Sequence, residues 1–279
     1  MKKLVILTIM TFLCTAVLAQ KESLEKRKFQ VEAFSGVELS GVINATVEQS
    51  HAHSLSIETY SDVFEYLHVK VKNGILQIGF KNGGLPRSIQ RKYRNLDISC
   101  KVTLPELKDI EMSGVTKLYV KDGFKTSAMN IELSGVSKAE LKYLECNDLD
   151  IEVSGVCELR MNGQADQLDL EISGASKGFF VFDGKTITFA DIDISGSGYA
   201  SLQGKAIRSS LNISGAADFN GPEFEVETMR AVVSGVGKAQ VRVLGSLEPE
   251  VSGAAKLRYN KNASLKNVNT SGAAHLTSY

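Results

Sequence analysis

The stretch LDIEVSGVCEL, residues 149–159, contains the pattern on which the whole fold depends. Apolar and acidic residues alternate up to Val153, and a Ser-Gly pair follows at Ser154 and Gly155. Strict two-residue alternation is typical of a β-strand with one buried face. A glycine directly after such a strand predicts a bend in the chain. We therefore expect a strand that leads into a corner, followed by a second strand whose apolar positions include Leu159.

This Ser-Gly pair belongs to a repeat with steps of 18 to 22 residues. Its nine serines are Ser113, Ser134, Ser154, Ser173, Ser195, Ser214, Ser234, Ser252 and Ser271. A period near 20 residues indicates one short unit that is stacked many times. A leucine-rich repeat of this length needs an asparagine ladder and a helix or tight turn on its outer side, and the sequence has neither. We predict an all-β fold, a parallel β-solenoid (β-helix) of about nine or ten ~20-residue coils.

Each coil has the same inside and outside positions. Counted from each serine as position 0, positions −3, −1, +5 and usually +7 are apolar, −4 and −2 are mostly acidic, and +4 is often lysine. Position +3 is small in every unit. We expect the glycine at +1 and the small residue at +3 to face inward, where the opposite wall comes close. The acidic columns would form a solvated β face, with cation binding as the alternative.

Residues 20–105 are also β-rich but lack the even spacing. The segment Val37–Gly41 resembles an extra ladder unit, 73 residues before its counterpart at Ser113. Alternating residues flank an Asn-Gly pair within Val69–Ile78, which is a strong signal of a β-hairpin. We expect a first coil and a capping hairpin that shields the open end of the stack. A polar loop would lie between Gly83 and Arg94, and residues 106–279 would form the regular solenoid.

The first 19 residues have the features of a secretory signal peptide. Lys2 and Lys3 precede the mostly apolar stretch Leu4–Leu18, and Val17 and Ala19 occupy the two positions that signal peptidase reads. This predicts an exported protein of the periplasm or outer cell surface, with no transmembrane segment after signal cleavage.

Three cysteines follow the predicted signal peptide, namely Cys100, Cys146 and Cys157. We interpret them as small buried apolar residues, and a Cys146–Cys157 disulfide stays open as the alternative.

Charge and motifs narrow the function classes. The predicted mature chain has 32 − 2 = 30 basic residues against 32 acidic ones, a net charge near −2. This balance gives no reason to expect nucleic acid as a partner. The sequence also lacks a nucleophile elbow, a phosphate loop, a zinc helix and a dinucleotide fingerprint. We therefore expect no enzyme activity, no catalytic residues, no cofactor and no metal site.

Three features carry a resemblance to a known family. They are the early β segment Gly41-Val42-Ile43-Asn44, the segment Val102-Thr103-Leu104-Pro105-Glu106-Leu107, and the ladder of strands joined by Ser-Gly pairs. Over about residues 29–275 the chain resembles bacterial exported proteins described as "putative auto-transporter adhesin, head GIN domain". The resemblance implies a β-solenoid at the cell envelope and brings no catalytic residues with it.

Breaks in the repeat are the candidate ligand-binding positions. Glu158, Tyr199 and Asp218 stand where the +4 column usually has lysine. Ordinary sequence drift is the alternative explanation. Arg87 and Arg91 lie in the expected polar loop, where they could meet an anionic polysaccharide or lipid headgroups, and a solvated charged loop is the alternative there.

Two hypotheses of function follow. The first is an exported, non-catalytic cell-envelope protein that presents a β-solenoid surface for binding or adhesion, with a glycan or an envelope protein as partner. Self-association through the C-terminal coil is a further hypothesis, since strand edges there would be exposed. The second is a carbohydrate-active β-helix enzyme, a polysaccharide lyase or hydrolase. Nearly loop-free coils and the absence of tryptophan disfavour it.

Overall fold

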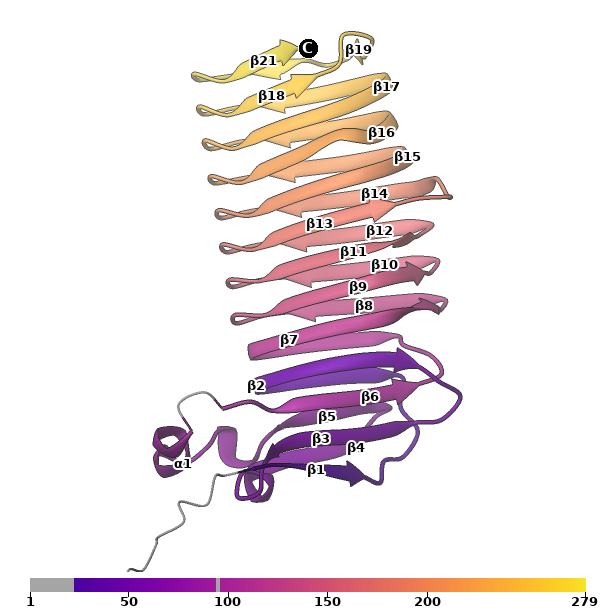
Figure 1. Ribbon diagram of the computed structural model, residues 1–279. Helices are drawn as coiled ribbons and strands as arrows, with labels where there is room; N and C mark the ends of the chain where they lie inside the picture. The colour runs from indigo at the N-terminus through magenta and orange to yellow at the C-terminus, as the bar shows by residue number, and fades with distance from the viewer. Residues whose placement is uncertain (1–22, 94–95) are drawn as a thin grey trace, which may run out of the picture.

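The computed structural model describes residues 23–93 and 96–279, so the predicted signal peptide lies outside the described residues. About 65% of the chain is strand, and the described residues contain one short α-helix. Figure 1 shows a straight rod with the N-terminal strands at one end and the C-terminus at the other. The expected parallel β-solenoid is confirmed, with about eight turns. The nine evenly spaced Ser-Gly corners from Ser113 to Ser271 enclose eight complete turns.

Each coil of the regular part has two walls of strands. The wall that leads into the Ser-Gly corner contains β8 (Ala128–Leu133), β10 (Asp148–Val153), β12 (Gln167–Ile172) and β14 (Ile187–Ile194). The wall that follows the corner contains β9 (Lys138–Glu145), β11 (Glu158–Gln164) and β13 (Lys177–Phe182). Longer strands continue through a corner, namely β7 (Asp109–Lys125), β15 (Tyr199–Ile213), β16 (Asp218–Val233) and β17 (Lys238–Val251). The last coils contain β18 (Lys256–Tyr259), β19 (Ser264–Leu265), β20 (Asn269–Thr270) and β21 (His275–Ser278).

Parallel pairing places like positions above like positions. Ile131 pairs with Ile151 and Asp150 pairs with Asp169, so each repeat position forms a column along the rod. The residues at −3, −1 and +5 are buried, as Ile131, Leu133 and Ala139 illustrate with at most 1% exposure. One coil cannot enclose its own apolar face, so stability comes from contact with the coils above and below.

The Ser-Gly corner differs from expectation in one respect. The nine glycines at +1 are exposed and have φ between 67° and 81°, so our expectation that they face inward is wrong. A Cβ on each would lie under 3.0 Å from the carbonyl oxygen of the glycine one coil earlier. The glycine is therefore needed for its left-handed backbone and for close stacking along the rod. The small residues at +3 do face inward, as Thr116 and Ser137 show with a hydroxyl contact of 2.9 Å.

The N-terminal end is capped by strands outside the repeat. β4 (Leu67–Lys72) and β5 (Ile75–Phe80) form the expected antiparallel hairpin, with Asn73 and Gly74 at positive φ in its turn. On the other wall, β1 (Leu24–Phe29) pairs antiparallel with β3 (Ser54–Tyr60), and β3 pairs antiparallel with β6 (Ser99–Leu104). The first coil, β2 (Gly36–Gln49), pairs directly with β7. The intervening residues therefore lie below β2, and the ladder continues from Gly41 to Gly114 without a gap.

The expected polar loop between Gly83 and Arg94 is partly helical instead. Helix α1 (Arg87–Lys92) occupies it, because Ile89 is buried against the cap. Just beyond the helix, Tyr93 stacks on Tyr60 with ring centroids 3.9 Å apart and donates a hydrogen bond to Asp62. Two short 3₁₀ turns precede the helix in the chain, η1 (Phe64–Tyr66) before β4 and η2 (Lys81–Gly83) after β5.

The three described cysteines, Cys100, Cys146 and Cys157, are free thiols inside the rod. The alternative of a Cys146–Cys157 disulfide is therefore wrong. Among residues 23–93 and 96–279, no helix has both the length and the apolar character needed to cross a membrane.

Candidate functional site

The two walls of the solenoid have different surfaces. We call the outer surface of β8, β10, β12, β14 and the first half of β7 the acidic face. With β2 it carries eleven stacked carboxylates: Glu38, Asp109, Glu111, Glu132, Asp148, Asp150, Glu152, Asp169, Glu171, Asp191 and Asp193. In the part of the chain that the structure describes, none of them lies within 4.0 Å of a lysine or arginine nitrogen. These eleven carboxylates therefore form no ion pair within the described residues.

Partial burial, followed by the stacking of like charges, raises carboxyl pKa values on this face. The pKa of Asp169 is raised by partial burial and then by the charges of Asp150 and Asp191. Burial is also the first cause of the raised pKa values of Asp109 and Glu111. A groove of about 580 Å³ follows Asp150, Asp169 and Asp191. No three carboxylate, imidazole or thiol groups of the described residues are arranged to hold a metal ion.

The opposite wall carries the +4 and +6 columns, which we call the mixed face. Register places Glu158, Lys177, Tyr199 and Asp218 on successive coils of the +4 column. Three candidate residues from the sequence, Glu158, Tyr199 and Asp218, thus share one surface. Tyr199 and Asp218 are direct neighbours, whereas Lys177 separates Glu158 from Tyr199.

Glu158 is engaged by two cations. Its carboxylate accepts from Lys138 at 2.9 Å and from Arg160 at 2.8 Å, and these contacts lower its pKa. Glu158 therefore holds the Arg160 side chain in a defined position on the surface.

Arg160 in turn covers an aromatic ring. Its guanidinium carbon lies 3.9 Å from the ring centroid of Phe179, which is a cation–π contact. Phe179 also packs against Tyr199, with ring centroids 5.6 Å apart and ring planes inclined at 48°. Both rings are half-buried on the outside of the rod. We call Arg160, Phe179 and Tyr199 the aromatic platform.

Sequence reasoning found Tyr199 but missed Arg160 and Phe179. The signal was present, because Gly178-Phe179-Phe180-Val181-Phe182 breaks the alternation and puts an aromatic ring at an outward +6 position. A phenylalanine on a solvated β face has no role in the core, since Phe180 and Phe182 fill the interior there. The contact with Arg160 required the register between β11 and β13.

A polar pocket lies where β13 ends. It has a volume of about 600 Å³ and begins at Phe182, the last residue of the strand that carries Phe179. Its lining includes Asp183, Lys185, Lys205 and Glu225. Groups of both charges, from the segment after β13 and from β15 and β16, thus lie at the end of the strand that carries Phe179.

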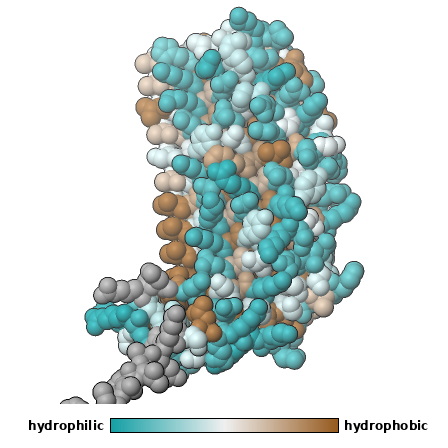
Figure 2. Space-filling model, in the orientation of Figure 1, coloured by the Kyte–Doolittle hydropathy of each residue, from teal (hydrophilic) through white to brown (hydrophobic). Residues whose placement is uncertain are grey.

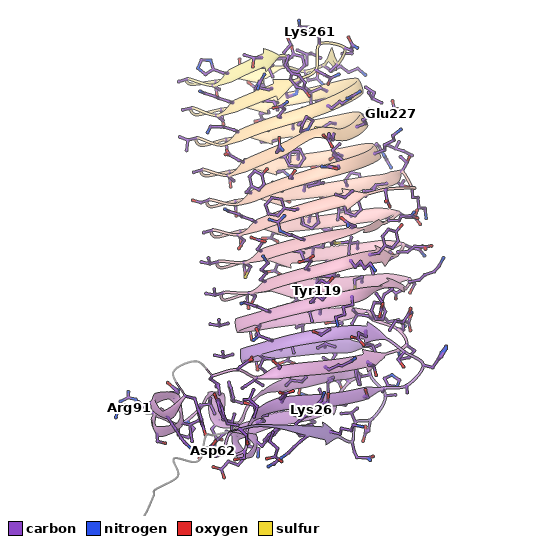
Figure 3. The ribbon with its side chains drawn as sticks, viewed as in Figure 1. Lys26, Asp62, Arg91, Tyr119, Glu227 and Lys261 are labelled. Atoms are coloured by element: carbon purple, nitrogen blue, oxygen red, sulfur yellow. The ribbon has the colours of Figure 1, made fainter. Side chains whose placement is uncertain are left out.

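Arg87 and Arg91 lie elsewhere. Both are exposed on α1 at the capped end of the rod. Figure 3 shows Arg91 beside the cap and well apart from Tyr119, which marks the mixed face. The structure therefore does not bring the two arginines together with Glu158, Tyr199 and Asp218.

Fold and site together define a class of protein, a parallel β-solenoid whose flank presents stacked aromatic and charged side chains. Comparison of the sequence with protein families is more specific. Residues 33–178 and 175–263 match the family model described as "putative auto-transporter adhesin, head GIN domain", and the chain belongs to this family. No curated protein matches the sequence.

Solved structures share the fold over nearly the full chain. A putative adhesin from Parabacteroides merdae is 17% identical, covers 93% of this chain and 97% of its own, and superposes with a TM-score of 0.66. A putative adhesin from Parabacteroides distasonis is 18% identical, with coverages of 92% and 98% and a TM-score of 0.65. A putative lipid binding protein from the same species is 18% identical, with coverages of 93% and 98% and a TM-score of 0.63. At these identities the likeness concerns the fold.

Proposed function

We propose that this chain is an exported, non-catalytic adhesin-type protein of the cell envelope that binds a glycan on its mixed face. Membership of the adhesin family and the predicted signal peptide support export and a place in the periplasm or at the outer surface. The observation that supports a glycan as the ligand is the aromatic platform, in which Phe179 is held between Arg160 and Tyr199.

The chemistry of the platform suits a sugar ring. A pyranose has an apolar C–H face that packs on an aromatic ring and polar hydroxyls around its edge. Around the rings lie Lys177 and Asp218, which can exchange hydrogen bonds with hydroxyl groups. Binding sites of this kind combine apolar contact with a few placed polar groups. The rod repeats its coils, so a linear glycan could continue toward the polar pocket at the end of β13.

A glycan array probed with the chain from residue 20 onward tests this proposal. We expect binding to one glycan class, and we expect Phe179→Ala and Tyr199→Ala each to weaken it about tenfold, equivalent to about 1.4 kcal/mol. Tyr119→Ala is the matched control, because Tyr119 is 40% exposed on the same face and has no ring or cation partner among the described residues. Unchanged melting temperatures would show that all three variants fold.

Three results would contradict parts of the proposal. Absence of binding to every glycan would overturn the glycan as ligand. Binding that survives in Phe179→Ala and Tyr199→Ala would move the site away from the platform. Cleavage of a bound glycan during incubation would favour the alternative of a carbohydrate-active enzyme. Repeating the glycan array in EDTA distinguishes the mixed face from the acidic face as the binding site. Loss of binding on chelation would point to the acidic face.

A further inference from the structure

The Ser-Gly corner carries an exposed apolar ridge. Position +2 is valine in four successive coils, and Val42, Val115, Val136 and Val156 are 41%, 52%, 53% and 58% exposed. Val42 pairs with Val115, and the backbone N–H groups of Val136 and Val156 donate to the corner glycines one coil earlier, at 2.7 and 2.9 Å. We call these four residues the valine ridge. Figure 2 shows apolar side chains in a column along this edge of the rod.

The fold does not require valine at this position. Later coils have Ala175, Ser197 and Ala216 at the same corner, before valine recurs at Val236, and they keep the same backbone, as the hydrogen bonds of their N–H groups to the preceding glycines show. Aliphatic side chains that are exposed in a continuous row indicate contact with another surface. The ridge is therefore a candidate interface rather than a packing feature.

Opposite charges flank the ridge on its two sides. In four of the ten coils the residue at −2 is glutamate and the residue at +4 is lysine, namely in the pairs Glu111 and Lys117, Glu132 and Lys138, Glu171 and Lys177, and Glu250 and Lys256. The acidic side also has a groove of about 140 Å³ between the carboxylates and the corner serines, lined by Glu111, Glu132 and Glu152. Lysine side chains are the size and charge that such a groove accepts.

We propose that the valine ridge is the interface of a parallel dimer, in which a second copy of this chain packs ridge to ridge. A two-fold axis parallel to the rod places the acidic side of one copy against the lysine side of the other. A two-fold axis perpendicular to the rod would place acidic side against acidic side, with Glu38, Glu111, Glu132, Glu152 and Glu171 all facing carboxylates. Charge complementarity therefore selects the parallel arrangement. Among the four coils of the valine ridge, two have the Glu and Lys pair, one has Glu38 with the neutral Asn44, and one has like charges, Glu152 and Glu158.

The size of the contact is adequate for a stable dimer. Ten corners at about 4.8 Å, counting Gly41, give a length of about 45 Å. A contact about 18 Å wide along this whole edge, of which the valine ridge covers about 14 Å, would bury the ~800 Å² per partner that is typical of specific interfaces. An apolar centre with a charged rim is also the usual composition of such contacts. This inference does not depend on glycan binding.

Sedimentation equilibrium of the chain from residue 20 onward tests the proposal. We expect a mass twice that of one chain at micromolar concentration. The variant Val136→Asp with Val156→Asp should weaken dimerisation at least tenfold. The matched control is Ile207→Asp with Leu244→Asp, because these side chains are 47% and 45% exposed and lie outside the valine ridge. The control should stay dimeric.

Charge reversal tests the orientation. In the parallel dimer Glu111→Lys faces Lys117 of the second copy, so this variant should weaken dimerisation, and Glu111→Lys combined with Lys117→Glu should restore it. In an antiparallel dimer Glu111→Lys would face carboxylates and would strengthen dimerisation. Neither residue has an ion-pair partner among the described residues, so the swap disturbs no salt bridge within one chain.

Cross-linking gives a second reading of orientation. With Val136→Cys the parallel two-fold axis brings residue 136 opposite its own copy, so oxidation should yield a covalent dimer, whereas Ile207→Cys should not. The native thiols are buried and give little background. A monomer at all concentrations would overturn the proposal. A dimer that tolerates the ridge variants but is lost when residues 252–279 are deleted would overturn it in favour of association through the C-terminal coil.

Discussion

At the scale of single residues, the corner glycines serve two separate requirements. Gly155 has φ of 80°, and a Cβ at this position would lie 2.6 Å from the carbonyl oxygen of Gly135. The positive φ is a conformational requirement that any turn glycine can share. The lack of space for a Cβ is a second requirement, which exists only in a stack of coils. The hairpin glycine Gly74 separates them, since its φ is 78° and nothing lies within 4 Å of a Cβ placed on it.

We therefore predict unequal costs for the same substitution. Gly74→Ala should lower the free energy of unfolding by about 1 kcal/mol, the cost of a left-handed alanine. Gly155→Ala should cost about 3 kcal/mol or more, because the coils must also move apart. Urea unfolding followed by circular dichroism measures both values. Equal losses would mean that close stacking contributes nothing at the corner.

Also at the residue scale, burial sets the chemistry of the cysteines. Burial raises the pKa of Cys100 to about 12, and burial followed by the charges of Asp148 and Asp166 raises that of Cys146 to about 12. The pKa of Cys157 is raised for the same first reason. The reactive thiolate is therefore scarce at neutral pH.

We predict that the folded chain from residue 20 onward is almost inert toward Ellman's reagent at about pH 8. In about 6 M guanidinium chloride all three thiols should react. Fewer than three in the unfolded chain would indicate a disulfide and would contradict the free thiols of the structure.

At the scale of elements, the stacking of β10, β12 and β14 concentrates like charges. Asp169 lies between Asp150 and Asp191 in register, and its folded-state pKa is raised, first by partial burial and then by these two charges. The folded state then binds this proton more tightly than the unfolded state does. Ionisation of Asp169 therefore destabilises the fold at pH values above its pKa, and the penalty disappears as pH falls below the ordinary value of 3.8.

Asp169→Asn should raise the melting temperature by about 1–2 °C at about pH 7, the size expected for a surface substitution. The difference should vanish near pH 3.5, where wild type is protonated too. Asp166→Asn is the control, because Asp166 is paired with Lys185 and should gain nothing. A gain that is equally large at both pH values would show that packing, not charge, is responsible.

Elements also differ in how well they could be predicted. The regular strands and the β4–β5 hairpin follow from local signals, namely two-residue alternation and an Asn-Gly turn. Helix α1 could not be predicted in this way, because six residues are too few to show a helical period. Its stability depends on burial of Ile89 against the cap. The inward orientation expected for the corner glycines also failed, since alternation does not continue through a left-handed residue.

At the scale of the whole molecule, the ends of the rod are unequal. Antiparallel strands cap the N-terminal end, whereas β20 and β21 leave the C-terminal coil open (Figure 1). A parallel dimer would direct both open ends the same way and present two aromatic platforms on one assembly. Two linked sites bind a repetitive ligand more tightly than one, because the second contact is intramolecular.

We predict that dimerisation depends on salt. The rim of the proposed interface consists of exposed charge pairs, whose attraction is screened within about 8 Å at physiological ionic strength and about 3 Å at 1 M. Raising sodium chloride from about 0.05 M to about 1 M should weaken the dimer severalfold in sedimentation equilibrium. A dimer that tightens with salt would indicate that the valine ridge acts without help from the charged columns.

The sequence by itself determined the repeat, the two walls of each coil and the column to which each residue belongs, because inside–outside alternation and glycine spacing are local properties of a chain. It also identified Glu158, Tyr199 and Asp218 as breaks in one column. Only the tertiary structure decided which columns become surfaces. The register of β11, β13 and β15 joins Arg160, Phe179 and Tyr199, and the stacking of corners turns separate valines into one ridge. These contacts connect different coils, and the distance between coils is set by backbone pairing along the rod rather than by any local signal.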